Sequence, residues 1–296
     1  MEITLLGTSS MVPTEERNHS SALLRYKEEN ILIDCGEGTQ RQLRKAKLSA
    51  MKITKILITH WHGDHILGLP GLLLTISSLG YSGSLEIYGP EGSKEYIRKI
   101  MDTFVLHDIV SYTVIEIDSG IFFENTEFYL EALPLVHGTR CLGYRIIEKD
   151  RYHIEVKKLK KMGVKEGPHL KYLQKGEDIV YGGKKIKVKD VTTLVVGKKI
   201  GFVTDTLFCD NAITLAKDVD ILFCESTYLE EFKQQAHERK HMTAFEAATV
   251  AKKAKAKKLV LIHFSQRYTD LSLFTKEAKK VFPKVSAGKD FLKFTL

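Results

Sequence analysis

The chain has 296 residues, of which 43% are hydrophobic, so it can form one large domain or two small ones with a sizeable core. Lysine and arginine (45) exceed aspartate and glutamate (37), which gives a net charge of +8. This balance favours an anionic partner or a surface rich in lysine and glutamate. No apolar run approaches the roughly 18 residues of a membrane span. The first residues have no signal-peptide layout, so we expect a cytoplasmic protein without membrane attachment.

Strands and helices are predicted to alternate along the chain. Short apolar and β-branched runs predict strands at Glu2–Leu6, Ser21–Tyr26, Asn30–Asp34, Ile56–Ile58, Ser84–Tyr88, Val114–Ile117, Phe128–Leu133, Lys198–Val203, Asp220–Cys224, Lys258–Ile262 and Phe291–Phe294. Helical spacing predicts helices from the turn after Asp34 to Ala46, and at Leu69–Leu79, Gly92–Phe104, Ala244–Ala256 and Leu271–Val281. The four cysteines, Cys35, Cys141, Cys209 and Cys224, have no paired spacing and are predicted to be reduced core residues. The interleaving predicts an α/β layered domain.

Two early loops are polar. The loop Gly7–Ser20 is long for a hairpin and is either a plain surface loop or one that contacts substrate. Asp34 follows a predicted strand and precedes the turn containing Gly36 and Gly38. Its carboxylate can orient a metal-bound histidine, or the segment can be a simple turn, and the residues alone leave both open.

A cluster of metal-ligand side chains follows the strand Ile56–Ile58. His60, His62, Asp64 and His65 lie within six positions, and Gly63 lets the backbone turn sharply. Three imidazoles and one carboxylate at the end of a strand are the ligands that zinc prefers. The cluster therefore predicts a metal site.

Other polar residues also follow predicted strands. These are His137, Asp205, Glu225 and His263. A lone histidine is usually structural, and an aspartate at a strand end can be a helix N-cap. Strand ends can meet at one edge of a sheet, however, so we expect His137 and Asp205 to join the metal site. His237 and His241 lie in the polar stretch before Ala244–Ala256, whose start has a predicted capping box, Thr243 with Glu246.

The segment from Asp150 to Gly183 is unusually basic and has little apolar periodicity. Gly167-Pro168 lies in its middle, and the lysines are Lys157, Lys158, Lys160, Lys161, Lys165, Lys171 and Lys175. Lysines can neutralise phosphates and interspersed tyrosines can stack on bases, so we favour RNA binding over a solvated charged loop. We predict an inserted flexible arm at about residues 152–182 within a single domain, 1–296.

The spacing His60-x-His62-x-Asp64-His65 resembles that of the metallo-β-lactamase superfamily. This resemblance implies an αββα sandwich and two metal ions per subunit, zinc or alternatively manganese. It assigns His60, His62 and His137 to the first ion. Asp64, His65 and His263 would hold the second, and Asp205 would bridge both. Two such ions can hold a hydroxide between them and clamp both oxygens of an in-line phosphoryl displacement.

Further motifs, taken together, resemble the short form of ribonuclease Z: Asp34-Cys35-Gly36-Glu37-Gly38-Thr39-Gln40, Glu225-Ser226-Thr227-Tyr228, His241-Met242-Thr243-Ala244 and His263-Phe264-Ser265-Gln266-Arg267-Tyr268. The resemblance implies an endoribonuclease that cuts precursor tRNA at its 3′ side, leaving a tRNA 3′-hydroxyl and a trailer 5′-phosphate. Asp64 would be the general base. His241, held by Glu225, would protonate the leaving oxygen, and His237 is a less favoured alternative.

The family resemblance also implies a homodimer whose arm grips tRNA. We expect RNA contacts at Arg17, Asn18, Lys157, Lys158, Lys160, Lys161, Gly167, Pro168 and Lys171. Glu15 stands where many family members have lysine, which leaves open how the chain treats a CCA end. The cut position relative to the discriminator base is also open.

Two other functions remain open. A superfamily hydrolase of small esters or thioesters would use the same metal ligands without needing a basic arm. An inactive RNA-binding relative would keep the fold without turnover. Metal content and cleavage of a precursor tRNA separate these possibilities.

Overall fold

The computed structural model describes residues 1–104 and 110–296. They form two compact units. The first unit comprises Met1–Phe123, Leu130–Ile146 and Lys199–Leu296, and the second comprises Glu124–Tyr129 and Ile147–Lys198. In the described ranges, no helix combines the length and apolar character that crossing a lipid bilayer requires.

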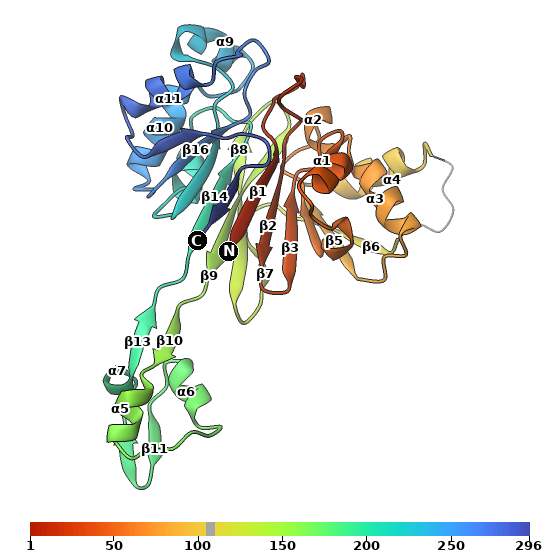
Figure 1. The fold of residues 1–296 in the computed structure, drawn as a ribbon. Coiled ribbons are helices and arrows are strands. Elements are labelled where there is room, and N and C mark those ends of the chain that lie inside the picture. The colour runs from red at the N-terminus through yellow and green to blue at the C-terminus, as the bar shows by residue number, and fades with distance from the viewer. Residues whose placement is uncertain (105–109) are drawn as a thin grey trace. The chain divides into compact units, whose positions relative to one another are not determined.

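Two seven-stranded sheets are the centre of the fold (Figure 1). The first has the order β18-β1-β2-β3-β4-β5-β6, built from β1 (Glu2–Gly7), β2 (Ser21–Tyr26), β3 (Glu29–Ile33), β4 (Lys55–Leu57), β5 (Leu85–Gly89), β6 (Tyr112–Glu116) and β18 (Lys293–Thr295). The second has the order β17-β16-β15-β14-β9-β8-β7, built from β7 (Gly120–Glu124), β8 (Phe128–Val136), β9 (Arg140–Glu148), β14 (Lys199–Val203), β15 (Ile221–Glu225), β16 (Leu259–Ile262) and β17 (Val285–Ala287).

Helices cover the outer face of each sheet (Figure 1). Beside the first sheet lie α1 (Thr39–Lys45), η1 (Ala50–Lys52), α2 (Gly63–Ile66), α3 (Leu69–Ser78) and α4 (Ser93–Met101). Beside the second lie α8 (Asp210–Leu215), η2 (Glu230–Phe232), α9 (Lys233–Glu238), α10 (Ala244–Lys253) and α11 (Ser272–Lys279). Each helix layer packs on its sheet through a separate apolar core. Between the sheets, the Phe223 ring lies 5.3 Å from that of Phe294 on β18. The predicted αββα sandwich is confirmed.

The predicted strands and helices of the first unit are present, with ends shifted by a few residues. Thr243 and Glu246 form the predicted capping box at the start of α10. The four cysteines are free, and three are buried. Elements that the sequence did not indicate include β7, β9, β17, α8 and α9. These lack a distinctive apolar period, or are too short to show one, and their structure depends on packing against neighbouring strands.

The second unit has its own small core. It contains β10 (Arg151–Ile154), α5 (Val156–Lys161), α6 (Leu170–Gln174), β11 (Ile179–Tyr181), β12 (Lys184–Ile186), α7 (Val188–Val191) and β13 (Thr192–Val195). Leu159, Val164, Leu173 and Ile186 are buried among neighbouring apolar residues. The segment 152–182, predicted to be a flexible arm, lies inside this unit, and its lack of apolar periodicity reflects elements of only three to six residues.

Candidate metal centre

The chain turns sharply after β4 and brings the histidine cluster to the end of the sheet. Asp34, just past β3, accepts hydrogen bonds at 2.8 Å from the Thr59 backbone N–H and at 2.9 Å from its hydroxyl. Helix α2 then begins at Gly63 and contains Asp64 and His65. A Cβ on Gly36 would lie 2.4 Å from the Asp64 carbonyl oxygen, so only glycine allows the chain after β3 to pack against this loop.

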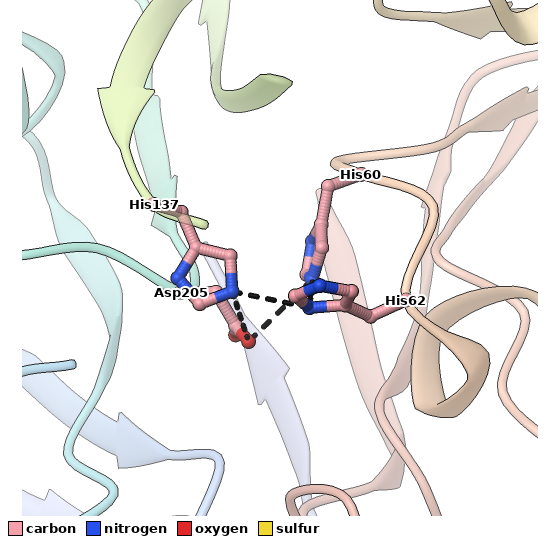
Figure 2. Close-up of side chains that lie close together, drawn as sticks. All are labelled: His60, His62, His137 and Asp205. Carbon is pink, nitrogen blue, oxygen red and sulfur yellow. Dashed lines mark hydrogen bonds and ion pairs between the residues drawn. The ribbon is translucent and has the colours of Figure 1, made fainter. Parts of the chain in front are cut away.

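Three imidazoles and one carboxylate oxygen form a first group of ligands (Figure 2). His62 Nδ1 lies 3.0 Å from His60 Nε2 and 3.1 Å from His137 Nε2. Asp205 Oδ2 is 3.6 Å from His60 Nε2 and 3.8 Å from His137 Nε2. The structure therefore brings together the residues that the superfamily resemblance assigned to the first ion.

Asp64, His65 and His263 form a second group with the other oxygen of Asp205. His65 Nε2 lies 3.3 Å from His263 Nε2 and 3.4 Å from Asp64 Oδ2. Asp205 Oδ1 lies 3.5 Å from His65 Nε2 and 3.3 Å from His263 Nε2. Asp205 thus gives one oxygen to each group, as expected of a bridging ligand.

Both groups fit a divalent cation. Zinc–nitrogen bonds of 2.0–2.1 Å in a tetrahedron place ligand atoms about 3.3 Å apart, close to the separations here. Asp64 Oδ1 and Asp205 Oδ1 are buried without a hydrogen-bond partner among the described residues. Burial lowers the pKa of His60, which favours the neutral imidazole that a metal needs. Burial alone would raise the pKa of Asp64, but His65 and His263 hold it well below its usual value, which keeps the carboxylate ionised.

Hydrogen bonds at Nδ1 leave Nε2 of His60, His65 and His137 free for a metal. His65 donates from Nδ1 to Asp34 (2.7 Å), and His137 donates from Nδ1 to the Lys240 carbonyl (3.0 Å). The hydroxyl of Thr59 donates to Asp34 and lies 3.1 Å from His60 Nδ1. Because its proton is used, that hydroxyl accepts from His60. Of the two interpretations of Asp34, the structure supports the one in which its carboxylate orients a histidine of the metal site, not a simple turn.

The hydroxyl of Thr227 acts on His263 as that of Thr59 acts on His60. Thr227 donates to Glu225 Oε2 at 2.7 Å, and its oxygen lies 2.9 Å from His263 Nδ1. Thr59 and Thr227 therefore each connect a buried carboxylate to an imidazole. Sequence reasoning missed both threonines, because one hydroxyl near a histidine motif is too common to be a signal.

Three of the nine described non-glycine residues with positive φ lie at the ends of strands that carry the site. Asp34, Asp205 and His263 have φ values of 55°, 29° and 62°, in the left-handed region that side chains other than glycine adopt uncommonly. Strained conformations of this kind persist where surrounding structure holds them and occur often at functional sites. Each residue follows a different parallel strand: β3, β14 or β16.

His241 and Glu225 lie together beside the second group. His241 Nδ1 is 3.0 Å from Glu225 Oε1, which also accepts the Thr206 backbone N–H at 2.7 Å. Burial lowers the pKa of His241, but the adjacent Glu225 carboxylate outweighs it and raises the pKa to about 9. The alternative residue, His237, instead contacts Glu246 at 2.7 Å and does not line the cavity over the metal ligands.

A cavity of about 260 Å³ lies over the ligands. Its lining includes predicted residues such as Asp64, Asp205, His241 and His263. It also includes residues that sequence reasoning did not assign: Ser10, Met11, Val12, Thr227, Tyr228, Arg239, Ser265, Gln266 and Arg267. Their positions depend on loops that no local pattern predicts.

Arg17 and Asn18, which are predicted to contact RNA, make structural contacts within the protein. Arg17 is buried, and its guanidinium donates at 2.9 Å to the carbonyl of Tyr268. Asn18 donates from its amide side chain to the carbonyl of Glu37 at 2.7 Å and from its backbone N–H to Asp290 at 2.8 Å. Both residues therefore stabilise the loop, while Glu15 in the same loop is exposed.

Replacing Thr59 with valine is expected to weaken metal binding about 10- to 100-fold, because His60 and Asp34 lose the hydroxyl between them. Competition with a chromogenic chelator measures the affinity. Thr59→Ser keeps the hydroxyl and is the matched control, expected near the parental value. Equal metal affinity in Thr59→Val and the parental protein would show that the hydroxyl does not orient His60.

Comparison with known proteins agrees with this geometry. The family described as beta-lactamase superfamily domain matches residues 173–264, and the family described as anti-Pycsar protein Apyc1 matches residues 1–108. A metallo-beta-lactamase fold protein, YhfI of Bacillus subtilis, has a TM-score of 0.72 at 21% identity, covering 99% of this chain and 98% of its own. The fold and the paired ligand groups together define a metallo-β-lactamase-type protein.

Relatives that match over nearly the whole chain identify the family within this superfamily. A ribonuclease Z of Picosynechococcus sp. is 41% identical over 100% of this chain and 96% of its own. A ribonuclease Z of Bacillus cereus is 39% identical over 99% of each chain. The crystal structure of human tRNase Z, short form, has a TM-score of 0.74 and 31% identity, covering 100% of this chain and 99% of its own. The chain belongs to the ribonuclease Z family.

Proposed function

We propose that this chain is a metal-dependent endoribonuclease that cuts precursor tRNA at its 3′ side. The products are a 3′-hydroxyl on the tRNA and a 5′-phosphate on the trailer. Family membership over the full length supports this substrate. The observation that carries the chemistry is Asp205, whose two oxygens belong to two adjacent ligand groups. Such a pair of sites suits in-line displacement at phosphorus.

The proposed cofactor is two zinc ions per subunit, with manganese as an alternative suited to the same ligands. His60, His62, His137 and Asp205 Oδ2 would hold one ion, and Asp64, His65, His263 and Asp205 Oδ1 the other. When bound, the ions would supply Lewis acidity at the phosphoryl group and lower the pKa of a water.

Asp64 and His241 divide the proton transfers in this proposal. Asp64 Oδ1 is buried, has no hydrogen-bond partner among residues 1–104 and 110–296, and belongs to a residue lining the cavity, so it can accept a proton from the attacking water. Glu225 keeps His241 protonated, so His241 can donate a proton to the departing 3′ oxygen of the tRNA. Glu225 is a positioning residue, because it acts through His241.

The lysines of the second unit are the proposed tRNA contacts. Those of α5, Lys157, Lys158, Lys160 and Lys161, are exposed, as is Lys171 on α6, and Gly167-Pro168 lies in the loop between the two helices. Exposed lysines on one short helix can follow a phosphate backbone without reading its sequence. The apolar core of the unit holds these helices in place.

The triple variant Lys157→Ala/Lys158→Ala/Lys161→Ala is expected to bind precursor tRNA more weakly. Each lost phosphate contact should reduce the slope of log affinity against log salt by roughly 0.7–0.9. Fluorescence polarisation at several salt concentrations measures both effects. A matched triple on α11 and its end, Lys276→Ala/Lys279→Ala/Lys280→Ala, should bind normally. Equal affinity and slope in the α5 triple would place the RNA elsewhere.

Assembly and location are also proposals. Two copies of the chain would form a homodimer in the cytoplasm, as the family resemblance implies. Light scattering of the purified protein measures its molar mass in solution, and a monomer at working concentrations would contradict the dimer.

Cleavage of a transcribed precursor tRNA with a 3′ trailer tests the function directly. We expect one cut at the base of the acceptor stem, lost with chelator and restored by zinc or manganese. No cut under any metal, together with hydrolysis of a small ester or thioester, would support the small-molecule alternative. Metal-free protein that only binds RNA would support the inactive relative.

A further inference from the structure

A second cavity opens beside the first group of metal ligands. It measures about 320 Å³ and is lined by Trp61, Pro90, Glu91, Gly92, Tyr96, Thr139 and Arg140. Trp61 stands between the ligands His60 and His62, and Arg140 follows His137 by three residues. Consecutive Cα atoms are about 3.8 Å apart, so the Trp61 backbone is one such step from each of two ligands, and the Arg140 Cα lies within about 11 Å of the His137 Cα.

Two aromatic rings form one wall of this cavity. The Trp61 and Tyr96 rings lie 5.3 Å apart between centroids, at an angle of 34°. The Trp61 indole N–H donates to Ser93 Oγ at 2.8 Å, and that hydroxyl donates to the Pro90 carbonyl at 2.6 Å. The indole is therefore fixed at one edge. Tyr96 is 45% exposed although it lies on a helix with a buried face.

A guanidinium group lies at the same cavity. Arg140 pairs with Glu91, and both side chains are largely exposed, at 61% and 71%. An ion pair this exposed contributes little stability, so it can exchange for another anion. A phosphate would be favoured, because a guanidinium can bind its oxygens with two parallel hydrogen bonds.

Packing alone explains only part of this arrangement. Trp61 does pack partly on the core of the first sheet, which accounts for one side of the indole. It does not account for an exposed tyrosine ring next to it, or for an arginine in the lining of the same cavity. Aromatic rings beside a guanidinium are the combination that binds an unpaired nucleotide, with stacking for the base and charge for the phosphate.

We propose that an unpaired nucleotide next to the scissile bond stacks its base on the Trp61–Tyr96 pair while Arg140 binds its phosphate. This inference rests on the proposed function. Bases in the acceptor stem are stacked and paired, so only the discriminator or the first trailer nucleotides can offer a free face. The site would hold the strand in line across the metal centre.

The chain contains a single tryptophan, so its fluorescence reports on this cavity alone. The probe is a precursor whose scissile 3′ oxygen is replaced by a methylene group, which can bind but not be hydrolysed. We expect tryptophan emission to be quenched on binding. Abasic substitution, one position at a time from the discriminator to the third trailer nucleotide, should abolish the quench at one position and weaken binding about 5- to 150-fold. That position identifies the nucleotide.

Variants of the wall separate stacking from a general effect on folding. Tyr96→Ala should weaken binding of the intact probe but not of the abasic one, and Tyr96→Phe should restore it. Phe245→Ala, which removes a similarly exposed ring on α10 (38%), is the matched control and should bind normally. Binding by polarisation without any quench, or parental affinity in Tyr96→Ala, would overturn the proposal. A parental enzyme that does not cut unmodified precursor would overturn the proposed function, and this inference with it.

Discussion

Replacing Asp64 with alanine is expected to reduce precursor cleavage by at least about 10³-fold, because one change removes the general base and a ligand of the second group. Binding of tRNA should change by no more than several-fold, since the proposed contacts lie in the second unit. Single-turnover cleavage at saturating enzyme measures the first quantity, and polarisation measures the second. Metal analysis should show less bound metal per chain than in the parental protein.

Asp64→Asn separates the two roles of this residue. The amide keeps an oxygen for the metal but cannot accept a proton, so metal content should fall less than in the alanine variant while cleavage stays low. Asp118→Ala changes an exposed carboxylate of the same unit and should cleave normally. Cleavage by Asp64→Ala at the parental rate would exclude Asp64 both as base and as ligand.

The first cluster of candidate metal ligands was predictable because its chemistry is rare and clustered. His60, His62, Asp64 and His65 are close in sequence, so the short turn after one strand is enough to bring them together. His137, Asp205 and His263 are distant in sequence. Asp205 and His263 follow strands of one parallel set, β14–β15–β16, and His137 follows β8 of the same sheet. Periodicity alone does not give the order of strands in a sheet. Only the family resemblance assigned His137 to the first ion, His263 to the second and Asp205 to both.

The hydrogen bonds that orient the ligands were not predictable in the same way. Thr59 directly precedes His60, and Thr227 lies two residues after Glu225. Neither position indicates that a hydroxyl will connect a carboxylate to an imidazole. Arg17 shows the same dependence on distant packing. The loop's resemblance to the family suggested an RNA contact, and the structure adds that Arg17 is buried against the carbonyl of Tyr268, 251 residues away. Residue type limits the possible roles, and distant packing selects among them.

In the basic segment, the sequence predicted the charge but not the apolar core. Leu159, Val164 and Leu173 are separated by charged and polar residues, and they become a core only when several short elements pack together. The same lysines can therefore be presented on ordered helices, which favours a defined RNA-binding surface over a disordered charged loop.

His241→Ala is expected to lower precursor cleavage by about 10²- to 10⁴-fold, the range typical of a lost general acid. Glu225 raises the pKa of His241 to about 9, so the parental imidazole carries its proton at neutral pH. His241 also lies in a third group of potential ligands, with Glu225 and His263, but not in the two groups that share Asp205, so the change should leave the metal content of those two sites unaltered. Steady-state cleavage between pH 6 and pH 10 and metal analysis provide the two measurements.

The decisive comparison uses a leaving group that needs no proton. Bis(p-nitrophenyl) phosphate releases a nitrophenolate that is stable as an anion, so His241→Ala should hydrolyse it within a few-fold of the parental rate while tRNA cleavage remains impaired. Glu225→Gln removes the carboxylate that raises the pKa of His241, so its activity on tRNA should fall at a lower pH than in the parental enzyme as the imidazole loses its proton. Equal losses on tRNA and on the nitrophenyl ester would contradict a proton donor and make His241 a structural residue of the cavity.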